Sequence, residues 1–265
     1  TGKFDDFSAN VVGELEYNLG YGYMQTGDED IFSAIVNASE IRSDIGVYRG
    51  MHKEMTGLMR YRMNVTRAKS EASGVGFWGS HSLYGDESGL YMAYLMTGDE
   101  WVYDSYKLCS QRTIEDMYAR PTLGTYQVEY WYFGNANNPY RVPNKGEFLE
   151  SRGMIRARST YLASQFFHDE RFKQASDAVV QWAENAQLDD GNYTQAYYHD
   201  GSLYYQAIPE GYDRQLPQKY WVNLIGFRGI AHLLYFEDNP KVLAIVKKMG
   251  DFLCGENEKF GQLLI

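Results

Sequence analysis

Cysteine is almost absent from this chain, which has only Cys109 and Cys254 among its 265 residues. A disulfide framework or a cysteine-rich zinc site is therefore not expected, and the sequence predicts no metal site. No apolar run approaches the ~20 residues that a transmembrane helix needs. Since hydrophobic residues still make up 44% of the chain, the sequence predicts a globular protein without a membrane span.

Basic residues are also scarce, because 25 Lys and Arg face 35 Asp and Glu and the formal net charge is −10. Binding to nucleic acid needs a basic stripe that neutralises phosphates, and the sequence shows none, so no nucleic-acid partner is expected. The same acidity opposes a polyanionic substrate, although a local cluster of arginine and lysine could override it.

Four stretches of the chain follow one plan. They are "YGYMQTGDEDIFSAIVNAS" (21–39), "YMAYLMTGDEWVYDSYKLCS" (91–110), "YLASQFFHDERFKQASDAVV" (161–180) and "AHLLYFEDNPKVLAIVKKMG" (231–250). Their turn residues Asp28, Asp99, Asp169 and Asn239 lie 71, 70 and 70 residues apart. A fixed period of this size indicates a repeated supersecondary unit.

Each unit has the chemistry of a turn between two helices. Gly27 and Gly98 can adopt the left-handed conformation that ends a helix, and the aspartate that follows each of them can cap the next helix. In the fourth unit Asn239 is the expected cap, with Pro240 at the first helical position. The sequence therefore predicts helical hairpins over about 8–46, 81–117, 150–187 and 217–254.

The two helices of each hairpin differ in their apolar pattern. After the turn, one apolar stripe is predicted to be buried, as in the set Phe172, Ala175, Val179, Trp182 and Ala186. Before the turn, residues 90–96 are apolar on every side, which predicts a helix enclosed by its neighbours. An all-α fold with inner and outer helices follows, and the long connections 47–80, 118–149 and 188–216 offer room for a site.

Inner and outer helices, Y-x-x-TGD turns and aromatic connections resemble the alpha/alpha toroids of carbohydrate-active enzymes. These are the six-hairpin glycoside hydrolases and the toroid polysaccharide lyases. In the families of greatest likeness a histidine precedes E-G-L-x-x-Y-Y-x-L-T-G-D at an inner helix, as His81 precedes Glu87-Ser-Gly-Leu and Tyr94-Leu-Met-Thr-Gly-Asp here. The resemblance implies a single alpha/alpha-toroid domain over 1–265. Because a ring needs six hairpins, two are irregular, the chain belongs to a longer protein, or the helices form an open solenoid.

The stretch "GFWGSHSLYGDESG" (76–89) holds the candidate catalytic residues His81, Tyr84 and Glu87. Histidine and tyrosine can act as base and acid in β-elimination at a uronate. Hydrolysis would instead need a second carboxylate opposite Glu87, from a residue such as Asp44 or Glu14. In the alternative structural interpretation, residues before 86 form a loop, Asp86 caps the helix, and His81 lies at the surface.

Other residues are candidates for substrate binding. Asp44, Arg49 and His52 lie together in "SDIGVYRGMHKEM" (43–55), and Arg152 and Arg156 are expected on one face at the start of the third inner helix. Arginine can hold a carboxylate through two parallel hydrogen bonds. Aromatic and polar groups that could stack on sugars are Trp78, Trp131, Tyr198 and His199. For each of these, a solvated loop or ordinary packing is the alternative.

The expected function is that of a carbohydrate-active enzyme without a cofactor, either a polysaccharide lyase or a related glycoside hydrolase. Its partner would be a glycan, and a secreted or periplasmic location is favoured. The alternative is a non-catalytic helical repeat that binds glycan or protein on its concave face. The sequence does not define the sugar or the oligomeric state.

Overall fold

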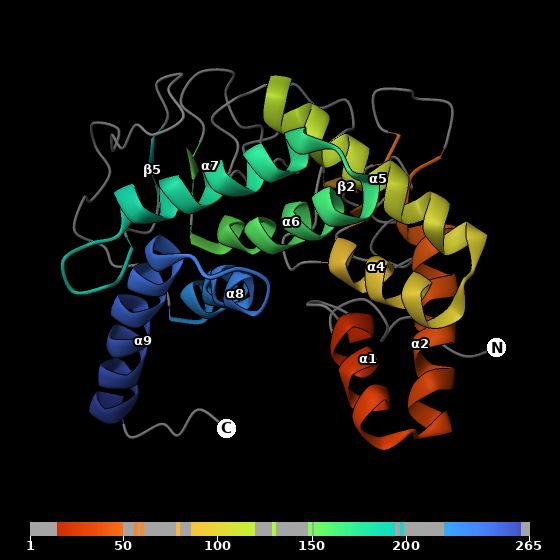
Figure 1. The fold of residues 1–265 in the computed structure, drawn as a ribbon, viewed down its shortest axis with the longest axis horizontal. Coiled ribbons are helices and arrows are strands. Elements are labelled where there is room, and N and C mark those ends of the chain that lie inside the picture. The colour runs from red at the N-terminus through yellow and green to blue at the C-terminus, as the bar shows by residue number, and fades with distance from the viewer. Residues whose placement is uncertain are drawn as a thin grey trace, which may run out of the picture. The chain divides into compact units, whose positions relative to one another are not determined.

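The computed structural model describes residues 15–49, 56–57, 59–60, 78–79, 86–119, 129–130, 148–149, 151–193, 197–198 and 220–260 (Figure 1). The chain divides into two compact units. Unit 1 comprises Thr1–Asp116 and Val128–Arg141, and unit 2 comprises Met117–Gln127 and Val142–Ile265. The expectation of one toroid domain over 1–265 stays a prediction.

Unit 1 contains two helical hairpins in its described residues. The first joins α1 (Leu15–Thr26) to α2 (Glu29–Ile41), and a π-helix, η2 (Arg42–Gly46), extends α2 directly. The second joins α4 (Asp86–Thr97) to α5 (Glu100–Ala119). Because α1 packs against both α2 and α4, the inner helices of the two hairpins are neighbours. The core between the helices contains Ile35, Leu90, Ala93, Val102 and Ile114, all almost completely buried.

The turns of both hairpins have the predicted chemistry. Gly27 and Gly98 are left-handed, with φ of 65° and 68°. Asp28 Oδ1 accepts a hydrogen bond from the backbone N–H of Asp30 at 2.9 Å, and Asp99 Oδ1 accepts one from the backbone N–H of Trp101 at 2.7 Å. These bonds satisfy N–H groups that the first turn of a helix leaves without a partner. The predicted capping by Asp28 and Asp99 is confirmed.

The residues that flank each turn also make matching contacts. The hydroxyl of Thr26 donates to a carbonyl four residues earlier and accepts from the N–H of Asp28, and Thr97 makes the same two bonds around Asp99. Tyr23 and Phe32 lie with ring centroids 5.2 Å apart, as do Tyr94 and Tyr103 in the second hairpin. The threonine of the TGD sequence is therefore part of the turn.

Unit 2 contains a 3₁₀ helix followed by two helical hairpins in its described residues. Its elements are η5 (Ser151–Ile155), α6 (Arg156–Phe167), α7 (Glu170–Ala186), α8 (Tyr220–Ala231), the 3₁₀ helix η6 (His232–Tyr235) and α9 (Pro240–Phe260). α6 packs on α7, while α8 packs on η5 and α9. In Figure 1 these elements run from green to blue.

The turns of unit 2 cap their second helices in the same way, with different residues. His168 takes the left-handed position, with φ of 55°, where the first two turns have glycine. Asp169 caps α7 by accepting from the N–H of Arg171 at 3.0 Å. Asn239 caps α9, which begins at Pro240 as predicted, by accepting from the N–H of Lys241 at 3.1 Å. Histidine at this position is uncommon, since residues other than glycine rarely adopt a positive φ.

The apolar patterns are confirmed for α7 but only in part for α4. All five residues of the predicted stripe, Phe172, Ala175, Val179, Trp182 and Ala186, are buried. In α4, Leu90, Met92 and Ala93 are buried, but Leu95 has 53% of its surface exposed. The prediction that residues 90–96 are enclosed on every side is therefore wrong at the last turn.

Short strands bring the long connections together within each unit. In unit 1, β2 (Trp78–Gly79) pairs antiparallel with both β1 (Met59–Arg60) and β3 (Glu129–Tyr130). In unit 2, β4 (Phe148–Leu149) pairs with β5 (Tyr197–Tyr198). Each strand has two residues, so the described part of the chain belongs to the all-α class, as predicted. None of its helices is both long and apolar enough to cross a membrane.

Candidate functional site

Of the three predicted catalytic residues, the structure describes only Glu87. His81 and Tyr84 lie outside the described residues. α4 begins at Asp86, which is therefore the first helical residue rather than a cap before the helix. Glu87 is in the first turn of α4, where its charge is favourable to the helix dipole, as the structural interpretation predicted.

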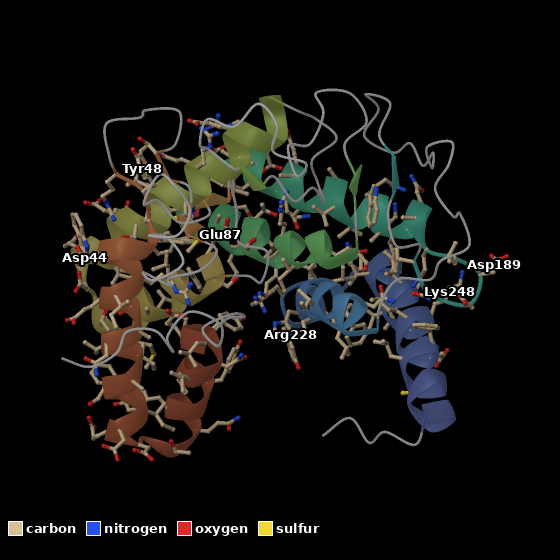
Figure 2. The ribbon with its side chains drawn as sticks, turned by 180° about the vertical axis from the view of Figure 1, so that it is seen from behind. Asp44, Tyr48, Glu87, Asp189, Arg228 and Lys248 are labelled. Carbon is tan, nitrogen blue, oxygen red and sulfur yellow. The ribbon has the colours of Figure 1, made fainter. Side chains whose placement is uncertain are left out.

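The side chain of Glu87, which is labelled in Figure 2, is buried and hydrogen-bonded to the neighbouring outer helix. Only 2% of its surface is exposed. The hydroxyl of Thr113, on α5, donates a hydrogen bond to Glu87 Oε1 at 2.6 Å. A charge-assisted bond of this length is strong and fixes the position of the acceptor carboxylate.

A second buried carboxylate, Glu16, lies at the start of α1 and was not predicted. Its surface is 0% exposed, and Arg42 Nε donates to Glu16 Oε1 at 2.6 Å. Among the described residues, Glu16 Oε2 has no hydrogen-bond partner. Glu16 Oε2 lies 2.6 Å from the point where a Cβ at position 89 would stand, so a side chain at that position would displace it. α1 and α4 thus meet at this carboxylate.

The two carboxylates occupy equivalent positions in their hairpins. Glu16 lies twelve residues before Asp28, and Glu87 lies twelve residues before Asp99. Their partners, Arg42 and Thr113, lie fourteen residues after the same aspartates, so both bonds join residues 26 apart. The same cross-link therefore connects the start of an inner helix to the far end of its outer helix. This register was the sequence signal that could have identified Glu16.

Unit 2 has no such cross-link at the equivalent positions. Counting from Asp169, these positions hold Ala157 and Ala183, and counting from Asn239 they hold Phe227 and Leu253. Both alanines are completely buried. Among the described residues, the hydrogen bond between the start of an inner helix and the far end of its outer helix therefore occurs at these positions only in the two hairpins of unit 1.

Tyr106 is a further buried polar residue near Glu87. Its side chain lies on α5, with a ring centroid 5.7 Å from that of Tyr91 on α4. Burial raises the pKa of Tyr106 well above its ordinary value of 10.0, and the charge of Glu87 adds to this effect. The phenol therefore keeps its proton at neutral pH and can serve only as a proton donor or a hydrogen-bonding group there.

Of the other candidates in unit 1, Arg49 makes its contacts with other residues of the protein. It donates to the backbone oxygen of Ser43 and to the hydroxyl of Ser105, and its guanidinium lies 4.1 Å from the ring centroid of Trp101. Burial lowers the pKa of Arg49. Arg49 therefore connects the end of the first hairpin to α5.

The remaining candidates of the 43–55 segment are placed only in part. Asp44 is exposed in η2, and Figure 2 shows it and Tyr48 in the same part of unit 1. His52, the third predicted binding residue, and Glu14, the other suggested second carboxylate, lie outside the described residues. A π-helix such as η2 often marks a functional region, and this one carries both Arg42 and Asp44.

The helix that carries the predicted arginine pair of unit 2 begins differently from the expectation. Residues 151–155 form a 3₁₀ helix, and α6 begins only at Arg156. The shared face of Arg152 and Arg156 was predicted for one continuous α-helix, and it stays a prediction. Arg156 is almost completely buried, and the side chain of Arg152 lies outside the described part.

Sequence patterns did not identify Arg158, which is completely buried on α6. Its Nη1 lies 2.7 Å from Nδ1 of His232, which is the first residue of η6. The two residues are 74 positions apart in the chain, so only the packing of α6 against α8 and η6 brings them together.

Two of the aromatic candidates lie in short strands, and the pairing of those strands gives the position of their backbone. Trp78 is in β2, opposite Arg60 and Tyr130, and Tyr198 is in β5, opposite Phe148. Their side chains, and the whole of Trp131 and His199, lie outside the described part of the chain. The backbone pairing nevertheless places parts of the aromatic connections side by side within each unit.

Within the described residues, no three or more His, Cys, Asp or Glu side chains are close enough together to hold a metal ion. The described site presents carboxylates, hydroxyls and guanidinium groups. No family model matches the chain, and neither a curated protein nor a solved structure matches it.

Proposed function

We propose that this protein is a carbohydrate-active enzyme, a polysaccharide lyase or a related glycoside hydrolase, built on an alpha/alpha toroid of helical hairpins. The observation that supports this proposal is the pair of buried carboxylates, Glu16 and Glu87, at equivalent starts of neighbouring inner helices. Glycan cleavage depends on acid and base groups that are held in fixed positions.

The cross-links supply this positioning. Arg42 and Thr113 each restrict one carboxylate by a 2.6 Å hydrogen bond from the outer helix. A positioned general acid or base contributes ~10²–10⁴-fold to a rate, and this contribution falls when the group is free to rotate. Glu16 and Glu87 would form the carboxylate pair of a hydrolase, whereas His81 and Tyr84 would act with Glu87 in a lyase.

The connections between hairpins add a binding surface for sugar. Aromatic rings stack on the C–H faces of sugars, while hydroxyl and amide groups bond to the sugar hydroxyls. The strand pairs β2–β3 and β4–β5 join aromatic segments from different connections, including Trp78 with Tyr130 and Phe148 with Tyr198. Within each unit, residues so placed could bind a sugar.

The test is to incubate the protein with uronate-containing polysaccharides and with neutral ones. Elimination is expected to raise ultraviolet absorbance through its unsaturated product, and hydrolysis is expected to create reducing ends without that absorbance. Glu87→Gln should abolish either signal while retaining the helical circular dichroism spectrum. The matched control is Glu29→Gln, an exposed residue in the first turn of α2. Absence of cleavage on every polysaccharide would refute the enzyme proposal.

A non-catalytic helical repeat is the second candidate. It is favoured by the burial of both carboxylates and by their bonds to outer helices, since structural locks would look the same. In that case Glu87→Gln would lower the melting temperature but leave glycan binding intact, and the wild-type protein would bind glycans without cleaving them.

A further inference from the structure

The inner helices α1 and α4 meet at two glycines, and each glycine receives a side chain from the other helix. A Cβ at Gly20 on α1 would lie 2.7 Å from Sδ of Met92 on α4. A Cβ at Gly89 on α4 would lie 2.6 Å from Oε2 of Glu16 on α1. An alanine at either position would therefore force the opposite side chain to move. The two glycines form a matched pair in one interface, where one faces a thioether and the other a carboxylate.

The carboxylate that fills the space at Gly89 is positioned from two sides. Arg42 Nε, at the start of η2, donates to Glu16 Oε1 at 2.6 Å. Glu16 Oε2 lies beside Gly89, in the first turn of α4, and has no hydrogen-bond partner among the described residues. The guanidinium thus fixes one oxygen, and the missing side chain at Gly89 allows the other oxygen to lie against α4.

Three features that are unfavourable or uncommon in a stable fold meet at Glu16. Glycine within a helix is less favourable than alanine, because it loses more conformational freedom on folding. A buried oxygen without a hydrogen bond loses its hydration and gains nothing in return. Arg42 belongs to a π-helix, which is rare in proteins and frequent at functional sites. Local conflicts of this kind are expected where function, and not stability, determines the residues.

The equivalent glycine of unit 2 has a different neighbour. Gly89 and Gly229 each lie ten residues before the capping residue of their hairpin. A Cβ at Gly229 would lie 2.5 Å from the backbone oxygen of Met154, in η5. Close packing of backbone against backbone therefore explains the glycine in unit 2. In unit 1 the space is filled by the side chain of Glu16, so a shorter residue there would leave room for an alanine at position 89.

We propose that Gly89 is a positioning residue for hydrolysis, because its lack of a side chain lets the Glu16 carboxylate lie against the turn of α4 that carries Glu87. The inference rests on the proposed function, and of its two enzyme classes it selects the hydrolase, in which these residues form the carboxylate pair. A positioned acid or base contributes ~10²–10⁴-fold to a rate. Displacement of Glu16 should therefore lower kcat much more than it changes KM.

The experiment measures the formation of reducing ends from neutral and uronate-containing polysaccharides by the full chain. Gly89→Ala should lower kcat about tenfold or more and leave KM within about twofold of wild type. Gly20→Ala is the matched control, since it makes the same change in the same interface opposite Met92. It should lower the melting temperature as Gly89→Ala does but keep kcat within about twofold of wild type.

A second pair of variants tests whether Gly89 acts through Glu16. Glu16→Gln should lower kcat roughly 10²-fold, and the addition of Gly89→Ala to it should lower kcat no further. A purely structural glycine would instead lower kcat by the same factor in both backgrounds. If Gly89→Ala alone does not fold, Glu16→Ala should restore the helical circular dichroism spectrum, because it removes the displaced carboxylate.

Four outcomes would overturn the role of Gly89. They are equal losses of kcat in Gly20→Ala and Gly89→Ala, a further loss when Gly89→Ala is added to Glu16→Gln, unchanged kcat in Gly89→Ala, and failure of Glu16→Ala to restore folding. Cleavage by elimination alone, seen as ultraviolet absorbance of an unsaturated product, would refute this inference and leave the proposed enzyme standing. Absence of any cleavage by the wild-type protein would refute both.

Discussion

At the scale of single residues, the two buried carboxylates of unit 1 have different partners. A buried carboxylate is destabilising unless hydrogen bonds or opposite charge compensate for its lost hydration. Arg42 gives Glu16 both a hydrogen bond and a positive charge, and the hydroxyl of Thr113 gives Glu87 a hydrogen bond. Removal of either partner should therefore destabilise unit 1.

Thr113→Val tests how strongly this bond stabilises the fold. Valine has nearly the same shape but no hydroxyl, so Glu87 Oε1 would lose its 2.6 Å donor. A hydrogen bond to a charged group contributes about 1.5–3 kcal/mol, and the free energy of unfolding should fall by that amount in urea denaturation. The exposed Gln111→Ala on the same helix should change it by less than about 0.5 kcal/mol. Equal effects of the two substitutions would contradict this account of Thr113.

Tyr106 is expected to make the free energy of unfolding fall as the pH rises above about 10. Because burial raises its pKa above 10.0 in the folded protein, the unfolded chain releases the phenolic proton at a pH where the folded protein still holds it. The contribution is therefore complete below pH 10 and is lost as the pH rises through the raised pKa. Tyr106→Phe should flatten the decline of the urea midpoint above about pH 10. Identical declines for both proteins would show that Tyr106 does not contribute.

At the scale of elements, the helix caps could be predicted from the sequence, whereas the contacts between helices could not. The turns at Gly27–Asp28 and Gly98–Asp99 depend on residues within a few positions of each other, so their caps could be predicted from the sequence. The cross-link of Glu16 joins residues 26 apart, and it forms only because two helices pack in one register. The exposure of Leu95 was missed because an apolar run does not show where neighbouring helices end.

Asp99→Ala measures the contribution of one cap to its hairpin. The substitution removes the acceptor for the N–H groups of Trp101 and Val102 at the start of α5. Loss of such a cap costs about 1 kcal/mol, so the melting temperature should fall by a few degrees. Asp99→Asn keeps an acceptor oxygen and should recover most of the loss. If alanine and asparagine are equally destabilising, the charge of Asp99 and not its capping bond stabilises the helix.

At the scale of the whole molecule, buried charge and total charge have different consequences. Unit 1 buries the carboxylates Glu16 and Glu87, and unit 2 buries the guanidinium groups of Arg156 and Arg158. These groups determine chemistry at short range. The net charge of −10 acts at longer range, through a field that repels anions before they reach any site. A polyuronate substrate would therefore bind against the field of the protein, whereas a neutral glycan would not.

This difference predicts how salt affects the proposed reaction. Raising the ionic strength from about 0.01 M to about 0.15 M shortens the Debye length from ~30 Å to ~8 Å and screens the repulsion. The KM for a polyuronate should therefore fall severalfold, while the KM for a neutral oligosaccharide should not change. Steady-state rates at several salt concentrations measure both values. A KM for polyuronate that rises with salt would mean that local basic groups, such as those at the starts of inner helices, outweigh the acidic surface and attract the substrate.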